Sequence, residues 1–187
     1  MEKNALSLFL ISMLFLSTLP ALGENAEEKN ITLKFPEMSL EEKNDYIFLE
    51  YNNSLSFSSL PTQPLLPYKA KVMTFPFGTK IESIEVKTGK VKIIKLDKKI
   101  HPAPNPVPLN TENAKVEIKE GRIYESNEAY PSDWITWNMG AGIENGVHVI
   151  FLSIHAFPAR YIPAKNELLY TNEIKIKVKY EPPEKPL

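Results

Sequence analysis

Polar and apolar residues alternate with a period of two along much of the chain. The clearest case is the segment 174–180, in which Ile, Ile, Val and Tyr alternate with Lys175, Lys177 and Lys179. This period is typical of a β-strand with one buried and one solvated face. The three lysines are interpreted as the solvated face, where they would also discourage pairing at a sheet edge.

Two glycine-containing dipeptides separate β-rich segments. Asn145-Gly146 lies between residues 134–141 and 147–155, and Thr88-Gly89 lies between residues 80–87 and 90–96. Both predict hairpins, and Asn-Gly is the stronger turn signal. Within 81–86 the apolar alternation slips by one residue, which predicts a β-bulge or a strand buried on both faces.

Proline and the scarcity of helical patterns set the fold class. Pro102, Pro104, Pro106 and Pro108 alternate within residues 101–109, which predicts a semi-rigid crossover in polyproline-like geometry. Only residues 39–42 resemble a helix start, with a capping-box pattern. We therefore expect an all-β fold: an antiparallel β-sandwich or open barrel with at most one or two short helices.

The N-terminus has the features of a signal peptide. An apolar run from Ala5 to Leu19 precedes Ala21-Leu22-Gly23, which has small residues at the positions read by signal peptidase. We expect residues 1–23 to be removed, leaving a β domain at 24–181 and a Pro-rich tail at 182–187; an uncleaved anchor is the alternative. The protein is then secreted or bound at the cell surface, with no membrane span after cleavage.

Composition narrows the chemistry. The 22 basic and 23 acidic residues are interleaved, so no basic face predicts a nucleic-acid partner. The absence of cysteine excludes a cysteine nucleophile, thiolate metal sites and disulfides. Of the three histidines, His148 and His155 are an odd distance apart on one predicted strand and would face opposite sides. No catalytic, cofactor-binding or metal-binding residue is assigned, although a small hydrolase is kept as a third hypothesis.

Four aromatic residues form a sequence cluster whose role has two interpretations. Tyr124, Tyr130, Trp134 and Trp137 could form a stacking platform for glycans. However, Trp134 and Trp137 are three residues apart, so a regular strand would point them to opposite faces. A core role is therefore favoured for at least one of them.

Two stretches of the chain resemble one known family. The first runs from Pro64-Leu65-Leu66-Pro67 through Val72–Gly78 into the 81–86 strand. The second runs from Tyr130-Pro131 through the 147–154 strand to Pro158-Ala159-Arg160-Tyr161-Ile162-Pro163 and the final alternating strand. Over residues 55–181 this order is similar to the N-terminal propeptide domain of gingipain-type cysteine peptidases. Leu65, Leu66 and Phe75 are expected in the core.

The motif residues also have physical interpretations as structural residues. Pro158 and Pro163 would rigidify the connection after a buried strand, and Arg160 would bond loop carbonyls or a carboxylate. Tyr161 would pack its ring and keep its hydroxyl in solvent. The motif positions to which we assign structural roles are Leu66, Pro67, Pro76, Gly78, Pro158, Arg160, Tyr161 and Pro163.

The resemblance implies a non-catalytic pro-domain that assists the folding of a cysteine peptidase or keeps it latent by occupying its active-site cleft. For such a role, Arg122, with Gly121 and Lys119, is the candidate cleft-plugging loop. No cofactor is implied, and the partner would be a gingipain-type catalytic domain. Because no peptidase half follows Tyr180, we expect a truncated product, a pro-domain acting in trans or a recruited module. The alternative function is a structural or adhesive cell-surface β-sandwich, including one that binds glycans.

Overall fold

The computed structural model describes residues 26–51, 55–107 and 116–185. The predicted signal peptide lies outside these ranges. The described part contains thirteen strands and two short 3₁₀ turns. The strands are β1 (Glu27–Lys34), β2 (Met38–Lys43), β3 (Tyr46–Tyr51), β4 (Ser56–Phe57), β5 (Pro67–Pro76), β6 (Lys80–Thr88), β7 (Lys92–Lys95), β8 (Lys99–Ile100), β9 (Ile135–Glu144), β10 (Val147–Ala156), β11 (Ala159–Ile162), β12 (Glu167–Tyr170) and β13 (Glu173–Glu181), and the turns are η1 (Arg122–Glu125) and η2 (Pro163–Lys165).

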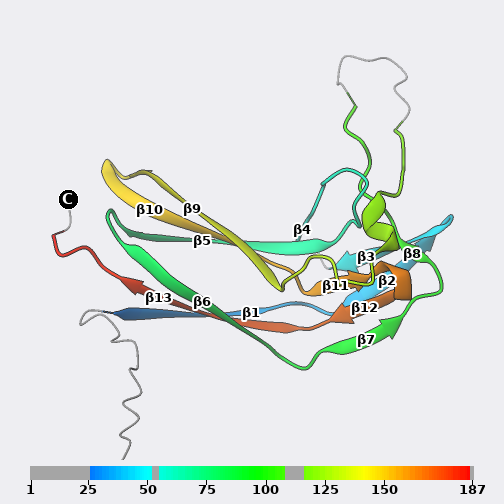
Figure 1. The fold of residues 1–187 in the computed structure, drawn as a ribbon, viewed down its shortest axis with the longest axis horizontal. Coiled ribbons are helices and arrows are strands. Elements are labelled where there is room, and N and C mark those ends of the chain that lie inside the picture. Colours follow the sequence, from blue (N-terminus) through cyan, green and yellow to red (C-terminus); the bar gives the residue numbers. More distant parts are fainter. Residues whose placement is uncertain (1–25, 52–54, 108–115, 186–187) are drawn as a thin grey trace, which may run out of the picture.

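The long strands form a two-layer sandwich (Figure 1). One layer has the strand order β1-β13-β6, and the other has the order β4-β5-β10-β9. All pairings within these two layers are antiparallel. The expected all-β sandwich is therefore confirmed.

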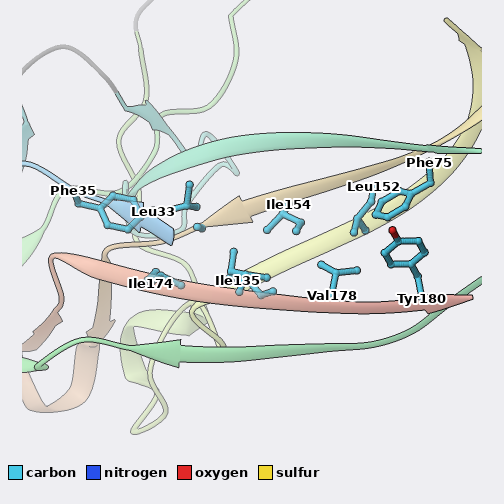
Figure 2. Packing of buried hydrophobic residues seen from close by; sticks show 11 residues of the cluster. Leu33, Phe35, Phe75, Ile135, Leu152, Ile154, Ile174, Val178 and Tyr180 are labelled. Carbon is cyan, nitrogen blue, oxygen red and sulfur yellow. The ribbon is translucent and has the colours of Figure 1, made fainter. Parts of the chain in front are cut away.

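Apolar side chains from both layers meet between the sheets (Figure 2). Phe75 of β5 packs edge-on against Tyr180 of β13, with ring centroids 4.8 Å apart. Ile154 and Val178 are fully buried. This first core contains Leu33, Phe35, Phe75, Ile135, Leu152, Ile154, Ala156, Ile174, Ile176, Val178 and Tyr180. Phe75 and Leu66 are buried as expected, whereas Leu65 is only half-buried.

Short strands build a second lobe beside the sandwich (Figure 1). One sheet has the order β11-β12-β7 and the other the order β2-β3-β8, in which β3 and β8 are parallel. The chain reaches this lobe by continuing beyond the long strands, from β6 into β7 and from β10 into β11. A second apolar cluster forms there, consisting of Ile47, Leu49, Leu66, Leu96, Ile100, Tyr124, Ala159, Tyr161 and Leu168.

The two expected hairpins have different outcomes. Asn145 (φ 52°) and Gly146 (φ 80°) join β9 to β10 in the left-handed conformations that a tight hairpin turn requires. The hairpin at Thr88-Gly89 is wrong. Gly89 has no positive φ, and its N–H donates to the carbonyl of Glu173 at 2.8 Å, so the chain continues from one sheet to the next.

The expected irregularity in the 81–86 strand is confirmed as a bulge. Along β13, Lys179 pairs with Ser83 but Tyr180 pairs with Ile81, so Glu82 has no partner of its own. This extra residue shifts the alternation, as the sequence pattern indicated.

The capping-box prediction is wrong, because residues 39–42 lie within strand β2. Asn44, with φ 55°, turns the chain directly into β3, and Leu40 pairs with Leu49. Pairing with a partly buried partner strand outweighed the local capping pattern.

The lysines of β13 are on a wet face but not at an edge, because β13 lies between β1 and β6. Lys177 pairs with Glu28 at 3.1 Å and Lys179 pairs with Glu85 at 3.0 Å. The edge-protection interpretation is therefore wrong: Lys177 and Lys179 form ion pairs with the neighbouring strands, and Lys175 pairs with Glu173 of its own strand.

Candidate partner-binding site

Two chain segments project together from the second lobe (Figure 1). The first, residues 103–107, leaves β8, and the second, residues 116–121, leads into η1. The N–H of Asn105 donates to the carbonyl of Glu117 at 3.3 Å, which holds the two segments side by side. We call residues 103–107 and 116–121 the projecting arm.

The base of the arm is anchored by backbone hydrogen bonds to residues 62–65. The N–H of Thr62 donates to Ala103 (2.9 Å), the N–H of Ala103 donates to Gln63 (2.7 Å), and the N–H of Gly121 donates to Thr62 (2.8 Å). The prolines of this segment have no N–H to donate, so its backbone hydrogen bonds are made by the residues between them, such as Ala103. Residues 101–107 form no strand apart from the isolated bridge of Pro102 to Pro64, and the polyproline-like geometry expected there stays a prediction. Residues 108–109 lie outside the described ranges.

Turn η1 is fixed to the second core by Tyr124. The hydroxyl of Tyr124 donates to the carbonyl of Ile100 at 2.8 Å, and its ring packs against Tyr161 with centroids 6.4 Å apart. Burial raises the pKa of Tyr124 well above its ordinary value, so the phenol remains a donor. This fixes the backbone from which Arg122 projects.

The candidate plug residues differ in their surroundings. Lys119 and Arg122 are exposed, and Gly121 is packed against Thr62. A Cβ at position 121 would lie 2.6 Å from Oγ1 of Thr62, so glycine is needed for this close approach. The structure thus brings Lys119 and Arg122 to the base of the projecting arm with both charges in solvent.

Glu120 holds the arm to the lobe by its carboxylate. It accepts a contact of 2.5 Å from Nζ of Lys99 and a hydrogen bond of 3.3 Å from the hydroxyl of Tyr46. Burial, and then the charge of Glu120, raises the pKa of Tyr46. The charge of Glu120 is thereby paired within the lobe, whereas Lys119 and Arg122 are exposed to a partner beside the carboxylates of Glu117 and Glu125.

The arm also has an apolar character that the sequence did not reveal. Val107, Val116 and Ile118 are 38%, 54% and 39% exposed on its two segments. Beside η1 lies a groove of about 630 Å³ whose lining includes Leu60, Tyr68, Ile123, Tyr130 and Phe157. Exposed apolar residues gathered on one side of a protein are typical of a partner-binding surface.

Arg160 has the structural role expected from its motif. Its Nε donates to the carbonyl of Pro131 at 2.8 Å, and a terminal nitrogen donates to the carbonyl of Ser132. The guanidinium also lies over the ring of Trp134, with Cζ 5.2 Å from the centroid. Burial lowers the pKa of Arg160, an effect opposed by nearby Asp133. Arg160 therefore ties β11 to the segment before β9.

Tyr161 differs from the expectation. Its side chain is fully buried, and its hydroxyl donates to Oδ1 of Asn166 at 2.5 Å instead of remaining in solvent. Burial raises the pKa of Tyr161 to about 12. Pro158 and Pro163 are also buried, at the two ends of β11. The motif packs in the second core, and a tyrosine hydroxyl buried there needs a hydrogen-bond partner from the protein.

The remaining motif residues define the ends of β5. Leu66 is fully buried and Pro67 begins the strand. Pro76 ends it, and Gly78 (φ 91°) makes the turn toward β6. A Cβ on Gly78 would lie 3.2 Å from Cβ of Pro183, so the tail returns to this turn.

The four clustered aromatic residues are dispersed. Tyr124 is in the second core, Tyr130 pairs with Tyr161 through the backbone, and Trp134 packs partly against the first core. Trp134 and Trp137 border the same hollow, because Trp134 precedes β9 and does not follow its alternation. The opposite-face rule therefore does not apply to this pair. The core role favoured for at least one tryptophan is confirmed by Trp134, and these rings form no common platform.

The histidines are packed individually. His155 lies against Tyr68, His148 against Phe77 and His101 against Phe48, with centroids 4.6, 5.7 and 4.3 Å apart respectively. In the described residues no group of three His, Cys, Asp or Glu side chains could hold a metal ion. Those residues also include no helix of sufficient length and apolarity to cross a membrane.

Comparison with known proteins decides the family. The sequence matches the family described as Propeptide_C25 over residues 29–187. The chain belongs to the Propeptide_C25 family. The resemblance found in the sequence is confirmed, and the chain is a non-catalytic pro-domain.

Solved structures of Porphyromonas gingivalis proteins share its fold. A complex of RgpB pro- and mature domains aligns with a TM-score of 0.62 and 14% identity, covering 85% of this chain and 82% of that one. A structure concerning the zymogenic latency of gingipain K aligns with a TM-score of 0.65 and 17% identity, covering 83% and 88%. The search of curated proteins finds no match.

The site residues that sequence reasoning missed are the anchors and the groove. Thr62 and Tyr124 fix the plug candidates, and the groove lining comes from five separate parts of the chain, around residues 57–60, 68, 123–132, 136 and 155–157. No sequence period joins residues so far apart. The only available signal was the Pro-rich composition around Pro64 and Pro102, which are bridged in the structure.

Proposed function

We propose that this pro-domain binds the catalytic domain of a gingipain-type cysteine peptidase, assists its folding and inhibits it by occupying its active-site cleft. The base of the projecting arm enters the cleft, where Arg122, the first residue of η1, and Lys119 supply the basic side chain that an Arg- or Lys-specific peptidase recognises. The observation that carries the proposal is the family match over residues 29–187 together with an arm whose basic and apolar side chains are exposed.

The construction of the arm supports an inhibitory role. An inhibitor must present its side chain from a backbone that does not have to be ordered on binding. Gly121 is bonded to Thr62 at 2.8 Å and Tyr124 to Ile100 at 2.8 Å, on either side of Arg122. The backbone at position 122 is therefore held before the partner arrives.

The apolar groove would extend the contact beyond the cleft. Leu60 is 57% exposed at the groove and Ile118 is 39% exposed on the arm. Stable protein interfaces usually need a buried apolar centre in addition to charged contacts. We assign Leu60 to a contact with the outside of the cleft.

Export is part of the same proposal. Residues 1–23 would direct the chain out of the cytoplasm, and Glu24 would be the first residue after cleavage. Mass spectrometry of the protein recovered from the medium or the cell surface tests this. A chain at the cell surface that keeps Met1–Gly23 would contradict cleavage and favour the uncleaved anchor.

The test of inhibition uses residues 24–187 and a gingipain-type catalytic domain from the same organism, assayed on Arg- and Lys-containing peptides. We expect stoichiometric, competitive inhibition. Arg122→Ala should raise the inhibition constant by roughly tenfold, which corresponds to about 1.4 kcal/mol of binding. Lys119→Ala tests the second candidate in the same assay.

Two controls separate the contributions. Lys175→Ala removes an exposed charge from the wet face of β13 and should leave inhibition unchanged. Leu60→Asp should weaken binding without changing the preference between Arg and Lys substrates. Tight binding without competition would exclude cleft occupancy, and no binding by a folded chain would exclude the partner itself.

A further inference from the structure

Strand β9 is an unpaired edge of the sandwich, and it differs from the other edges in its charge. The edges of the two layers are β1, β6, β9 and, on the remaining side, β4 together with residues 69–76 of β5, which β4 does not cover and which include Lys69 and Lys71. Strand β6 contains two lysines and two glutamates, β1 also contains several charges, and β4 is only two residues long. Strand β9 has ten residues and one charge, Glu144 at its end. Charges and short length are how proteins keep edges from pairing, and β9 has neither.

The core face of its sheet extends out to this uncovered strand. Trp137 pairs with Ile154 and Met139 pairs with Leu152, both of which are fully buried on β10. Paired residues of neighbouring strands share a face, so Trp137 and Met139 lie on the core face. Yet Trp137 is 49%, Met139 48% and Ile143 65% exposed. Trp137 borders a hollow with Ile84 and Val86 of β6, where the sandwich is open at its side.

The order of residues along β9 is self-complementary. Suppose that two copies of β9 are related by a two-fold axis perpendicular to the sheet, so that residue i of one copy lies opposite residue j of the other. The two side chains lie on the same face of the sheet only when i + j is even. With the axis at Gly140, Trp137 meets Ile143 of the second copy, and Met139 meets Ala141. The single charge, Glu144, meets Thr136, so no like charges are opposed.

Gly140 fits the position on the axis. No atom lies within 4 Å of the position that its Cβ would occupy, and its φ is not positive. The neighbouring Gly142 is covered within its own chain by the ring of Phe151, whose Cε2 would be 2.6 Å from an added Cβ. The face of the sheet that Gly140 occupies is therefore unobstructed at the axis, and the edge itself has no neighbouring strand.

We propose that β9 is a homodimerisation edge, at which two copies pair antiparallel about Gly140 to form a continuous eight-stranded sheet. The occupant is a second copy of this chain because β9 supplies an apolar, uncharged and symmetric partner for itself. Main-chain hydrogen bonds would join the two strands, and the apolar side chains between Trp137 and Ile143 would become buried at the interface. This inference is independent of peptidase inhibition.

The first experiment measures mass against concentration by analytical ultracentrifugation of residues 24–187. We expect a reversible change from monomer to twice the monomer mass. Met139→Lys places lysines of the two copies diagonally across the interface and should weaken dimerisation by roughly tenfold. Val72→Lys is the matched control, because Val72 is 53% exposed on β5, at the opposite side of the same sheet and beyond the two residues that β4 covers. It should dimerise like the unchanged protein.

The second experiment fixes the register and uses the absence of native cysteine. Single cysteines are placed at Met139, Gly140 and Ala141, and each variant is oxidised. Directly opposed residues have Cα atoms about 4.5–5.5 Å apart, within the range of a disulfide, whereas diagonal neighbours are farther apart. Gly140→Cys should form a covalent dimer much faster than the other two variants. Glu85→Cys, on the charged edge β6, is the control for random collision.

Three results would overturn the proposal. The first is a monomer at every concentration, with Gly140→Cys no faster than Glu85→Cys. The second is a dimer that Met139→Lys leaves intact. The third is a monomer in which Met139→Lys instead lowers affinity for a gingipain-type catalytic domain, because β9 would then be a peptidase contact. Loss of inhibition with the dimer retained would contradict only the proposed function.

Discussion

The hydroxyl of Tyr161 donates a hydrogen bond to Oδ1 of Asn166 at 2.5 Å, inside the second lobe. Asn166 ends η2 in a left-handed conformation (φ 52°, ψ 45°), and its Nδ2 donates to the carbonyl of Leu96 at 2.7 Å. One side chain therefore connects β11, η2 and the end of β7. If either partner of such a buried hydrogen bond is removed, the other is left without a partner, which lowers the free energy of unfolding.

The first prediction concerns this contact. Tyr161→Phe should lower the free energy of unfolding by about 1–3 kcal/mol, because Oδ1 of Asn166 loses its donor. Urea denaturation followed by circular dichroism measures the change. Asn166→Ala should cost about 1 kcal/mol more than Asn166→Gly, because glycine adopts the left-handed conformation without strain. Equal stabilities of these two variants would contradict the strain argument.

The second prediction concerns the fork of Arg160. Arg160→Lys should lower the free energy of unfolding by about 1–2 kcal/mol, since an ammonium cannot bond the carbonyls of Pro131 and Ser132 together and lie flat on Trp134. The matched control is Arg122→Lys, at an exposed position, which should change stability by less than about 0.5 kcal/mol. Comparable losses in both variants would argue against the fork. Tryptophan fluorescence during denaturation provides the measurement.

The sequence correctly predicted strands and turns that depend only on neighbouring residues. The alternation at 174–180 and the Asn145-Gly146 turn both correspond to observed elements, because period and positive φ are local properties. The hairpin prediction at Thr88-Gly89 was wrong because a glycine is found both in hairpin turns and where a strand continues into a second sheet. Which of the two happens depends on Glu173, which is 84 residues away.

The site was only partly accessible from sequence. The family resemblance indicated Lys119, Gly121 and Arg122, and the structure places them at the base of the arm, where its second segment meets η1. It could not indicate that Thr62 anchors Gly121, because a backbone hydrogen bond carries no residue signature. The hydroxyl of Tyr161 was misjudged for a similar reason, since its partner Asn166 is supplied by a backbone turn.

The third prediction concerns acid stability. His101 stacks on Phe48 and meets Tyr46 edge-on, and burial lowers its pKa below the usual 6.5. The unfolded chain therefore binds a proton at His101 before the folded chain does, so the folded state loses stability as the pH falls through and below 6.5. His101→Phe keeps the stacking and cannot be protonated.

The comparison is the free energy of unfolding of both proteins at pH 7.5 and pH 5. The unchanged protein should lose more stability than His101→Phe over this interval, and the difference isolates His101 from the carboxylates. His155→Phe is the control, as His155 also stacks on a ring. Parallel pH profiles for the unchanged protein and His101→Phe would exclude the histidine as a source of acid sensitivity.

The last prediction compares two glycines. A Cβ on Gly121 would be 2.6 Å from Oγ1 and 3.0 Å from the carbonyl oxygen of Thr62, whereas a Cβ on Gly140 meets nothing within 4 Å. Gly121→Ala should therefore displace the arm from residues 62–65 and cost about 1–3 kcal/mol. Gly140→Ala should cost less than about 0.5 kcal/mol. Gly121→Ala should also weaken peptidase inhibition, because Arg122 would be presented from a shifted backbone. Denaturation and inhibition assays on both variants measure this, and an unchanged Gly121→Ala protein would contradict the need for glycine at this close approach to Thr62.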